Sequence, residues 1–360
     1  MNKITKLEKL PPVKFEPNPP FGSVFAPHVL KMELKLDGTN NYDAVIKPFE
    51  SDSFLPSTAA LHYGQSIFEG MKAYRQKDGG VGVFRADLHA ARFRKSSQRM
   101  VMAEVPEDIF LNCIKEYVSF VADNVPSLDG HSLYLRPLLF AADTKVKVTP
   151  SQNYLFYIMS TIAGSYFGGG GKVRPARVMV CREFVRAYPG GLGETKTAAN
   201  YAASIWPQRI AAKKDCDQVL FLDAVHHDFI DELGGMNFFV IRGNELITPE
   251  LNGSILHGIT RRSILEIASS LDLKPVEKKL SFTQVKKEIE SGQITEVFAC
   301  GTAAVISPIG ELVFQEKVNS ESEIIKLKGE PKVSLQLLDV LSKIQRGHLP
   351  APGNWIFKCT

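Results

Sequence analysis

The stretch GLGETKTAANYAAS, residues 191–204, places one lysine, Lys196, among glycine, alanine, serine and threonine, with Asn200 and Tyr201 shortly behind it. Small neighbours leave room for a flat ring beside the lysine. A desolvated amine loses its proton more readily, and only the neutral amine attacks an aldehyde. The stretch therefore favours a lysine that forms a Schiff base with an aldehyde cofactor, with the Tyr201 phenol directed at the same cavity.

Two other interpretations of Lys196 stay open from these residues alone. Most lysines in glycine-rich loops are solvated surface residues. Residues 190–197, GGLGETKT, also approach the phosphate-loop pattern G-x-x-x-x-G-K-[ST], but Thr195 stands where a glycine must precede the lysine. Because that glycine lets the backbone wrap a phosphate, the match is poor.

Composition and charge argue against several broad classes. The 360 residues are 44% hydrophobic and 23% charged with a formal net charge of +4, values that are typical of a globular protein. The sequence has no block of lysines and arginines that would suggest nucleic-acid binding, and no apolar run is long enough to cross a membrane. Five scattered cysteines without a CxxC and eight histidines without ligand spacing predict neither disulfides nor a metal site. The N-terminal residues show no signal peptide, so we expect a cytoplasmic protein.

The pattern along the chain predicts a mixed α/β protein with two domains. Four consecutive glycines within residues 164–175 cannot hold a helix or strand, so this segment is the expected linker. It separates a smaller domain at 1–163, which has an irregular arm at 1–22, from a larger one at 176–360 that carries Lys196. Strands are expected at 32–38, 42–50, 132–142, 153–164 and 296–312, hairpins at 218–235 and 236–250, and helices from about 86, at 197–216, 259–273, 282–292 and 333–346.

An aldehyde cofactor such as pyridoxal phosphate makes further demands, and the sequence offers candidates for each. The ring nitrogen needs a carboxylate, and Glu232 ends one apolar strand before a Gly-Gly turn. Taken alone, however, Glu232 reads more readily as a solvated hairpin-end residue. The phosphate needs backbone N–H groups at a helix start, which Ile259 and Thr260 after Gly258 would supply, unless this is ordinary capping. The small-residue turn at Thr302 is a second candidate.

Two arginines are candidate anion ligands. Arg92 lies on the helix that begins near residue 86, where a solvated face is the ordinary explanation. Arg136 is more informative, because strand alternation puts it on one side with Tyr134 and puts the neighbouring leucines on the other. A buried arginine needs an anion, either an internal Asp or Glu or a substrate carboxylate.

Seven stretches, in this order along the chain, resemble the branched-chain amino acid aminotransferases, which are fold-type IV pyridoxal phosphate enzymes with the D-amino acid aminotransferase-like fold. They are LHYGQSIFEGMKAYR, FRADLHAARFRKSSQRM, SLYLRPLLF, VRAYPGGLGETKTAANYA, QVLFLDAVHHDFIDELGGMN, LNGSILHGITRRSIL and EVFACGTAAVISPIGEL. The resemblance runs from about Phe21 to the C-terminal helix. GGLGETKTAANYA with DELGGMN is specific for the group, and HYGQSIFEGMKAYR narrows it to the branched-chain members.

The resemblance implies transfer of the amino group between leucine, isoleucine or valine and 2-oxoglutarate, in a homodimer or a higher assembly. Lys196 would bind pyridoxal 5'-phosphate and move the proton at the substrate Cα. Glu232 would pair with the pyridine nitrogen, and Tyr201 with the ring hydroxyl. The residues implied for the phosphate are Arg92, Ile259, Thr260 and Thr302.

The resemblance also assigns the substrate contacts. The α-carboxylate would bind Tyr63 and the turn Thr302-Ala303, and Arg136 would bind the γ-carboxylate of glutamate. The apolar pocket would be lined by Phe21, Phe68, Tyr134 and Tyr166. One departure is Gly235, where family members often carry Thr or Ser, so a hydroxyl is missing there.

The rival functions come from three classes. Within the same fold they are a D-amino acid transaminase and an aminodeoxychorismate lyase, which are typically shorter and lack the FEGMKAYR context. A nucleotide-binding phosphotransferase would use the GGLGETKT loop. A non-catalytic cofactor- or amino-acid-binding protein is the third, although lysine, acid and tyrosine together argue against it.

Overall fold

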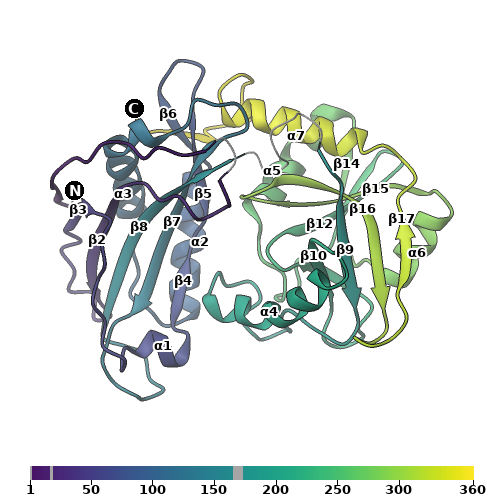
Figure 1. Ribbon diagram of the computed structural model, residues 1–360, viewed down its shortest axis with the longest axis horizontal. Coiled ribbons are helices and arrows are strands. Elements are labelled where there is room, and N and C mark those ends of the chain that lie inside the picture. Colours follow the sequence, from purple (N-terminus) through teal and green to yellow (C-terminus); the bar gives the residue numbers. More distant parts are fainter. Residues whose placement is uncertain (1, 17–18, 165–172) are drawn as a thin grey trace. The chain divides into compact units, whose positions relative to one another are not determined.

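The computed structural model of the chain describes residues 2–16, 19–164 and 173–360. They form two compact units, each built on its own sheet (Figure 1). The first unit comprises Met1–Gly170, Thr195–Ala199 and Lys343–Thr360, and the second comprises Gly171–Glu194 and Asn200–Ser342. None of the helices in the described ranges combines the length and apolar character that a membrane-spanning helix needs.

The sheet of the first unit is almost entirely antiparallel. Its strands follow the order β1-β3-β2-β8-β7-β5-β6-β18, with β4 beside β7, and only β1 and β3 pair in parallel among the described strands. The strands are β1 Ile4–Lys6, β2 His28–Lys35, β3 Ala44–Pro48, β4 Ser66–Phe68, β5 Met71–Arg75, β6 Val81–Phe84, β7 Ser132–Ala141, β8 Asn153–Ala163 and β18 Ile356–Lys358.

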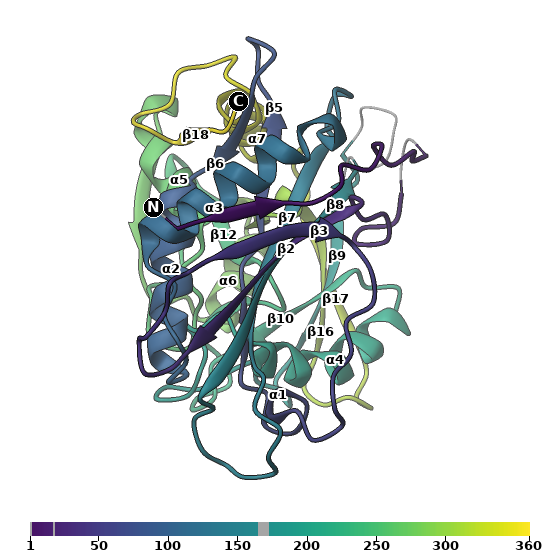
Figure 2. The same ribbon diagram turned by 90° about the vertical axis from the view of Figure 1, so that its left-hand side faces the viewer.

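Alternation along β7 separates two faces of this sheet, as the sequence predicts. Leu133 and Leu135 lie in the hydrophobic core, whereas Tyr134 and Arg136 point to the opposite face. Helices α2 (Ala86–Arg99) and α3 (Glu107–Phe120) cover the core face (Figure 2). There the rings of Phe93, Phe110 and Phe156 pack together with centroids 5.2 to 6.1 Å apart. Burial of each ring stabilises the unit by about 1.5–3 kcal/mol relative to exposure.

The second unit has a mixed sheet in the order β11-β10-β9-β16-β15-β12-β13-β14, with β17 beside β16. The predicted hairpins are confirmed, because β10 pairs with β11 and β12 with β13 in antiparallel fashion. The strands are β9 Ala176–Cys181, β10 Gln218–Leu222, β11 Ile230–Leu233, β12 Asn237–Arg242, β13 Glu245–Thr248, β14 Lys274–Glu277, β15 Ile294–Gly301, β16 Val305–Gln315 and β17 Glu323–Lys326.

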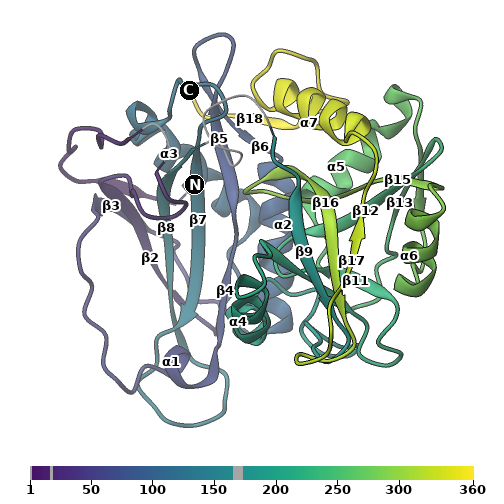
Figure 3. The same cartoon turned by 45° about the vertical axis from the view of Figure 1, so that its right-hand side comes forward.

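The helices predicted at 197–216, 259–273, 282–292 and 333–346 correspond to α4, to α5 with η2, to α6 and to α7, whereas α1, α3 and η1 were not predicted. Helix α4 continues through Pro207, and α6 packs on β15 and β17 (Figure 3). Hydroxyl capping by Ser281, which accepts from the Gln284 N–H at 3.2 Å, begins α6. The bounds are α1 Ala59–Tyr63, η1 Ala122–Asn124, α4 Ala198–Ala212, α5 Ile259–Ile267, η2 Ala268–Leu271, α6 Phe282–Glu290 and α7 Lys332–Gln345.

Two expectations differ from the structure. The single strand predicted at 296–312 is two strands, β15 and β16, which fold back on each other with Gly301 opposite Val305. The break follows from the small residues 302–304 between them. The predicted C-terminal domain, 176–360, also differs at two segments, because Thr195–Ala199 and Lys343–Thr360 belong to the first unit. Most of the expected linker, residues 165–172, lies outside the described residues.

Candidate active site

The main chain around Lys196 is tied to the first unit on both sides. Its N–H donates to Ser96 Oγ on α2 at 3.2 Å, and its carbonyl accepts from the Phe68 N–H at 3.0 Å. Thr197 adds a hydroxyl bond to the Ser66 carbonyl at 2.8 Å and a bridge to Ile67. These bonds extend the edge of β4 and make this short segment part of the first unit. The Lys196 Nζ lies 5.0 Å from the Phe68 ring centroid.

Lack of side-chain bulk before Lys196 has a local reason. A Cβ on Gly193 would lie only 2.3 Å from the Ser254 carbonyl oxygen and 2.4 Å from its Cα. The loop 190–194 and the loop around Ser254, both in the second unit, therefore touch backbone to backbone. Only glycine permits that approach.

Aromatic rings and one arginine gather beside Lys196 in the first unit. The Arg136 guanidinium carbon lies 4.5 Å from the Phe68 ring centroid, and Arg136 Nη2 donates to the Tyr134 hydroxyl at 3.1 Å. Phe21 meets the Tyr134 ring edge-on, with centroids 5.0 Å apart. Hence the structure brings together Phe21, Phe68, Tyr134, Arg136 and Lys196, which the resemblance assigned to one site.

Arg136 lacks the internal carboxylate that sequence reasoning left open as its partner. Within the described part of the chain, no Asp or Glu pairs with it, and its Nε is buried without a hydrogen-bond acceptor. A half-buried cation in this state is suited to an anionic ligand.

Two further residues that were predicted to contact substrate are Tyr63 and Tyr166. Tyr63 ends α1, where its ring contacts His62 and 39% of the residue is exposed. Tyr166 lies outside the described residues, so its predicted role stays a prediction.

Arg92 projects from α2 and pairs with a buried carboxylate. Its Nε and Nη2 donate to Glu69 at 2.7 and 2.8 Å, and Glu69 also contacts His89 Nδ1 at 2.6 Å and the Gly70 N–H at 3.1 Å. Burial alone would raise the pKa of Glu69, but the charges of Arg92 and His89 hold it far below its usual range. The pair uses two of the five guanidinium N–H donors and so fixes the plane of the guanidinium.

In the second unit, Glu232 on β11 is buried rather than solvated. Its Oε1 accepts from the Leu256 N–H at 2.9 Å and pairs with Arg186 Nη2 at 2.8 Å. Its Oε2 accepts from Asn237 Nδ2 at 2.8 Å. The isolated hairpin-end interpretation of this glutamate is therefore wrong, because the carboxylate has the hydrogen bonds and counter-ion that burial requires.

The start of α5 adjoins the Glu232 carboxylate through Asn237. A Cβ on Gly258, the residue before the helix, would lie 1.8 Å from Asn237 Oδ1. No side chain caps α5, and its first turn carries no acidic residue. The N–H groups of Ile259 and Thr260 have no acceptor within the helix, and the helix dipole favours an anion there.

The turn at Thr302-Ala303 reaches the same region of the second unit. A Cβ on Gly301 would lie 3.1 Å from Met236 Cγ and 3.2 Å from the Gly235 carbonyl oxygen. Tyr201 lies on α4, where its carbonyl accepts from Ser204 Oγ, and Ser204 in turn lies near Gly234. The turn that follows Glu232 thus lies beside the turn at Thr302-Ala303 and beside α4, and Asn237 links it to the start of α5.

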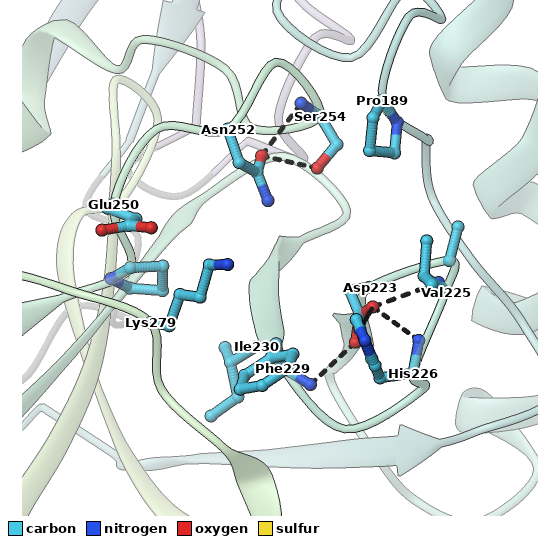
Figure 4. A pocket seen from close by; sticks show the side chains of 12 residues that line it. Pro189, Asp223, Val225, His226, Phe229, Ile230, Glu250, Asn252, Ser254 and Lys279 are labelled. Carbon is cyan, nitrogen blue, oxygen red and sulfur yellow. Dashed lines mark hydrogen bonds and ion pairs between the residues drawn. The ribbon is translucent and has the colours of Figure 1, made fainter.

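A cavity of about 160 Å³ opens nearby in the second unit, and none of the predicted site residues lines it (Figure 4). Asp223 on its wall accepts from the N–H groups of Val225, His226, Asp228 and Phe229. Although burial opposes ionisation, these donors lower the pKa of Asp223 to about 2. The acid is thus engaged in holding the turn between β10 and β11.

Sequence reasoning missed three residues that hold the predicted ones. Glu69, Arg186 and Asn237 each contact a predicted site side chain, and each lies inside a stretch already quoted for its resemblance. The signal available was a charged or amide residue amid apolar neighbours. The partner of each residue was not visible, because the pairs join segments that are far apart or on different elements.

Comparison with known proteins agrees with this arrangement. A family model described as amino-transferase class IV matches residues 66–312. The chain belongs to the class IV aminotransferase family.

Its relatives point to one branch of that family. The chain is 42% identical to a probable branched-chain-amino-acid aminotransferase of Streptomyces coelicolor, covering 94% of this chain and 92% of the relative. It is 37% identical to branched-chain-amino-acid transaminase 1 of Bacillus subtilis over 99% of both. The solved branched-chain amino acid aminotransferase of Escherichia coli superposes with a TM-score of 0.73 at 25% identity, covering 88% of this chain and 97% of that one. The predicted fold-type IV class is confirmed.

Two glycines of the second unit allow a matched test of this packing. Gly258→Ala drives a Cβ into the Asn237 amide, which donates to Glu232 and to the Leu256 carbonyl. We expect it to lower the free energy of unfolding by about 2 kcal/mol, measured by urea titration. A Cβ on Gly235 meets nothing within 4 Å, so Gly235→Ala should change stability by less than about 0.5 kcal/mol. Equal losses in both variants would contradict this account.

Proposed function

We propose that this chain is a pyridoxal phosphate-dependent branched-chain amino acid transaminase. It transfers the amino group of L-leucine, L-isoleucine or L-valine to 2-oxoglutarate, giving the branched 2-oxo acids and L-glutamate. The observation that carries the proposal is the Phe68 ring beside both Lys196 and Arg136, together with the lack of an Asp or Glu partner for Arg136 among the described residues. The names of the Streptomyces and Bacillus relatives support the same activity.

The residues present fit pyridoxal phosphate. The carboxylate of Glu232 pairs with a buried arginine, and in its ionised form it suits a protonated ring nitrogen. The uncapped start of α5 suits a phosphate. When bound, the cofactor supplies an electron-withdrawing ring that stabilises negative charge at the substrate Cα.

The protein side chains then have separate tasks. Lys196 holds the cofactor and moves the proton at the substrate Cα. Hydrogen bonds fix the main chain of Lys196, so its amine starts from a constant position. Glu232 holds the ring nitrogen and Tyr201 the ring hydroxyl. The phosphate ligands we propose are Arg92, Ile259, Thr260 and Thr302. The Glu69 pair orients Arg92 for this task.

One substrate pocket has to accept leucine and glutamate in alternate half-reactions. Phe21, Phe68 and Tyr134 offer apolar walls, while Tyr63 and Thr302-Ala303 take the α-carboxylate common to both. The resemblance adds Tyr166, which lies outside the described residues. Arg136 binds only the γ-carboxylate of glutamate or 2-oxoglutarate. Because its guanidinium rests on the Phe68 and Tyr134 rings, it retains partial compensation of its charge when leucine is bound.

We also propose that the active form is a homodimer in a reducing, cytoplasmic compartment. The five cysteines are unpaired and buried, which suits such a compartment. Large apolar side chains are exposed in and beside α1, namely Phe54, Leu55, Leu61 and Tyr63. Such a patch is suited to a second copy of the chain.

Colour is the first test of the function. The purified protein should be yellow with bound cofactor, bleach when L-leucine is added without an oxo acid, and regain colour with 2-oxoglutarate. Lys196→Ala should lose at least about 10²–10⁴-fold in rate, the range expected for a positioned proton-transfer group. Bleaching by D-alanine but not by leucine would assign a D-amino acid transaminase. A protein that stays colourless after pyridoxal phosphate is supplied would reopen the phosphate-loop interpretation.

Arg136→Ala separates the two substrates. We expect kcat/KM for glutamate to fall about 10- to 100-fold, as for the loss of one hydrogen bond to a charged group, with a much smaller loss for leucine. Steady-state kinetics with each amino acid measure this. Arg177→Ala, at a partly exposed ion pair with Glu311, serves as the control. Equal impairment with both substrates would refute the division of labour.

The dimer proposal is tested by the mass in solution. Light scattering should report twice the chain mass of 39.9 kDa. Leu61→Glu, at a side chain that is 70% exposed on α1, should shift the mass toward the monomer. Ile324→Glu, on β17 and 48% exposed, should not. A monomeric unsubstituted protein would rule out the dimer.

A further inference from the structure

Arg186 is a buried arginine to which the sequence argument assigned no role. It follows β9 in the second unit and is 7% exposed. Its Nη2 pairs with Glu232 Oε1 at 2.8 Å and donates to the Gly193 carbonyl at 2.9 Å. It also donates to the Ser254 carbonyl. Three oxygens from three separate segments therefore meet at one guanidinium nitrogen.

Each of these segments leads to a group with a proposed task toward the cofactor. Gly193 lies three residues before Lys196, and Ser254 precedes Ile259 at the start of α5. Glu232 is itself the proposed partner of the ring nitrogen. The close backbone approach of Gly193 to Ser254 occurs where Arg186 binds both carbonyls.

Arg186 brings a positive charge to the Glu232 carboxylate. Two groups that donate hydrogen bonds to Glu232, the Leu256 N–H and the Asn237 amide, are both neutral. A buried carboxylate with neutral donors alone is driven toward its protonated form, whereas an adjacent cation favours the ionised form. Only the ionised form attracts a protonated ring nitrogen.

We propose that Arg186 is a positioning residue that keeps Glu232 ionised and aligned. The inference rests on the proposed function, since it acts through the contact of Glu232 with pyridoxal phosphate. Arg186 itself is assigned no contact with cofactor or substrate.

The test uses the full-length protein with Arg186→Met, Arg186→Lys and the control Arg182→Met. Arg182 lies four positions earlier and is also ion-paired, but with Asp228 and Glu316. For each protein, pyridoxal phosphate is removed and titrated back, which gives the Kd and the absorbance maximum of the bound cofactor. Urea titration of the cofactor-free form gives stability, and kinetics with leucine give kcat and KM.

Arg186→Met should bind pyridoxal phosphate about 10- to 100-fold more weakly, with a shifted absorbance maximum and a reduced kcat, whereas the KM for leucine stays within about threefold. Arg186→Lys keeps the charge and should recover part of the affinity. Arg182→Met should match the unsubstituted protein in Kd and absorbance. In a Glu232→Gln background, Arg186→Met should have little further effect on Kd, because the charge it compensates is gone.

Other outcomes overturn the inference. One is an unchanged Kd and absorbance maximum in Arg186→Met. The other is an equal loss of pyridoxal phosphate affinity with and without the Glu232 carboxylate, which would mean that Arg186 is a purely structural residue. If Arg186→Met does not fold, Arg186→Lys decides: weaker binding at an unchanged urea midpoint supports the proposal, and unchanged binding overturns it. If the unsubstituted protein binds no pyridoxal phosphate, the proposed function is also refuted. If the unsubstituted protein and Arg186→Met both bind it normally, only this inference is refuted.

Discussion

A buried carboxylate is tolerated only where hydrogen-bond donors and a cation surround it, and this requirement at Glu232 organises the second unit. Its oxygens accept hydrogen bonds from β12 and from the loop before α5, and the cation comes from the segment after β9. Those elements are thereby held against β11 with little freedom. Gly258 and Gly193 mark where the resulting closeness leaves no space for a Cβ. In the first unit, Glu69 imposes a similar constraint on α2 through Arg92 and His89.

The pocket residues of the first unit show how one site can meet opposed demands. An arginine without a protein carboxylate would normally be costly away from water. Here the rings of Phe68 and Tyr134 lie under the guanidinium and offer a cation–π attraction of about 0.5–2 kcal/mol. That attraction is weaker than a carboxylate pair, so the arginine still favours an anion when one arrives. Under the proposed function, the same rings serve as the walls for an aliphatic side chain.

Local patterns predicted what depends on local sequence. The alternation of β7, the two hairpins after residue 218 and the helix that begins at Ala86 were all predictable, because side-chain period and turn residues specify them. The small residues at Thr302 indicated a turn, but the strand predicted at 296–312 ran across it, because apolar residues on both sides mask the reversal into two strands. Glu69 with Arg92, and Arg186 with Glu232, were also missed. Each pair joins residues 23 or more positions apart, and no local period encodes such a meeting.

The closing edge of the first sheet has a consequence for how the chain acquires its structure. Strand β18 pairs with β6, and the Val81 N–H donates to Thr360 across a separation of 279 residues. The Trp355 carbonyl accepts from the Arg85 N–H just where α2 begins. During synthesis on the ribosome, the entire second unit is made before β18, the partner strand of β6, exists. The hydrogen bond at the start of α2 therefore forms only after the chain is nearly complete, and contacts of such long range slow folding and prolong the exposure of unpaired strand edges.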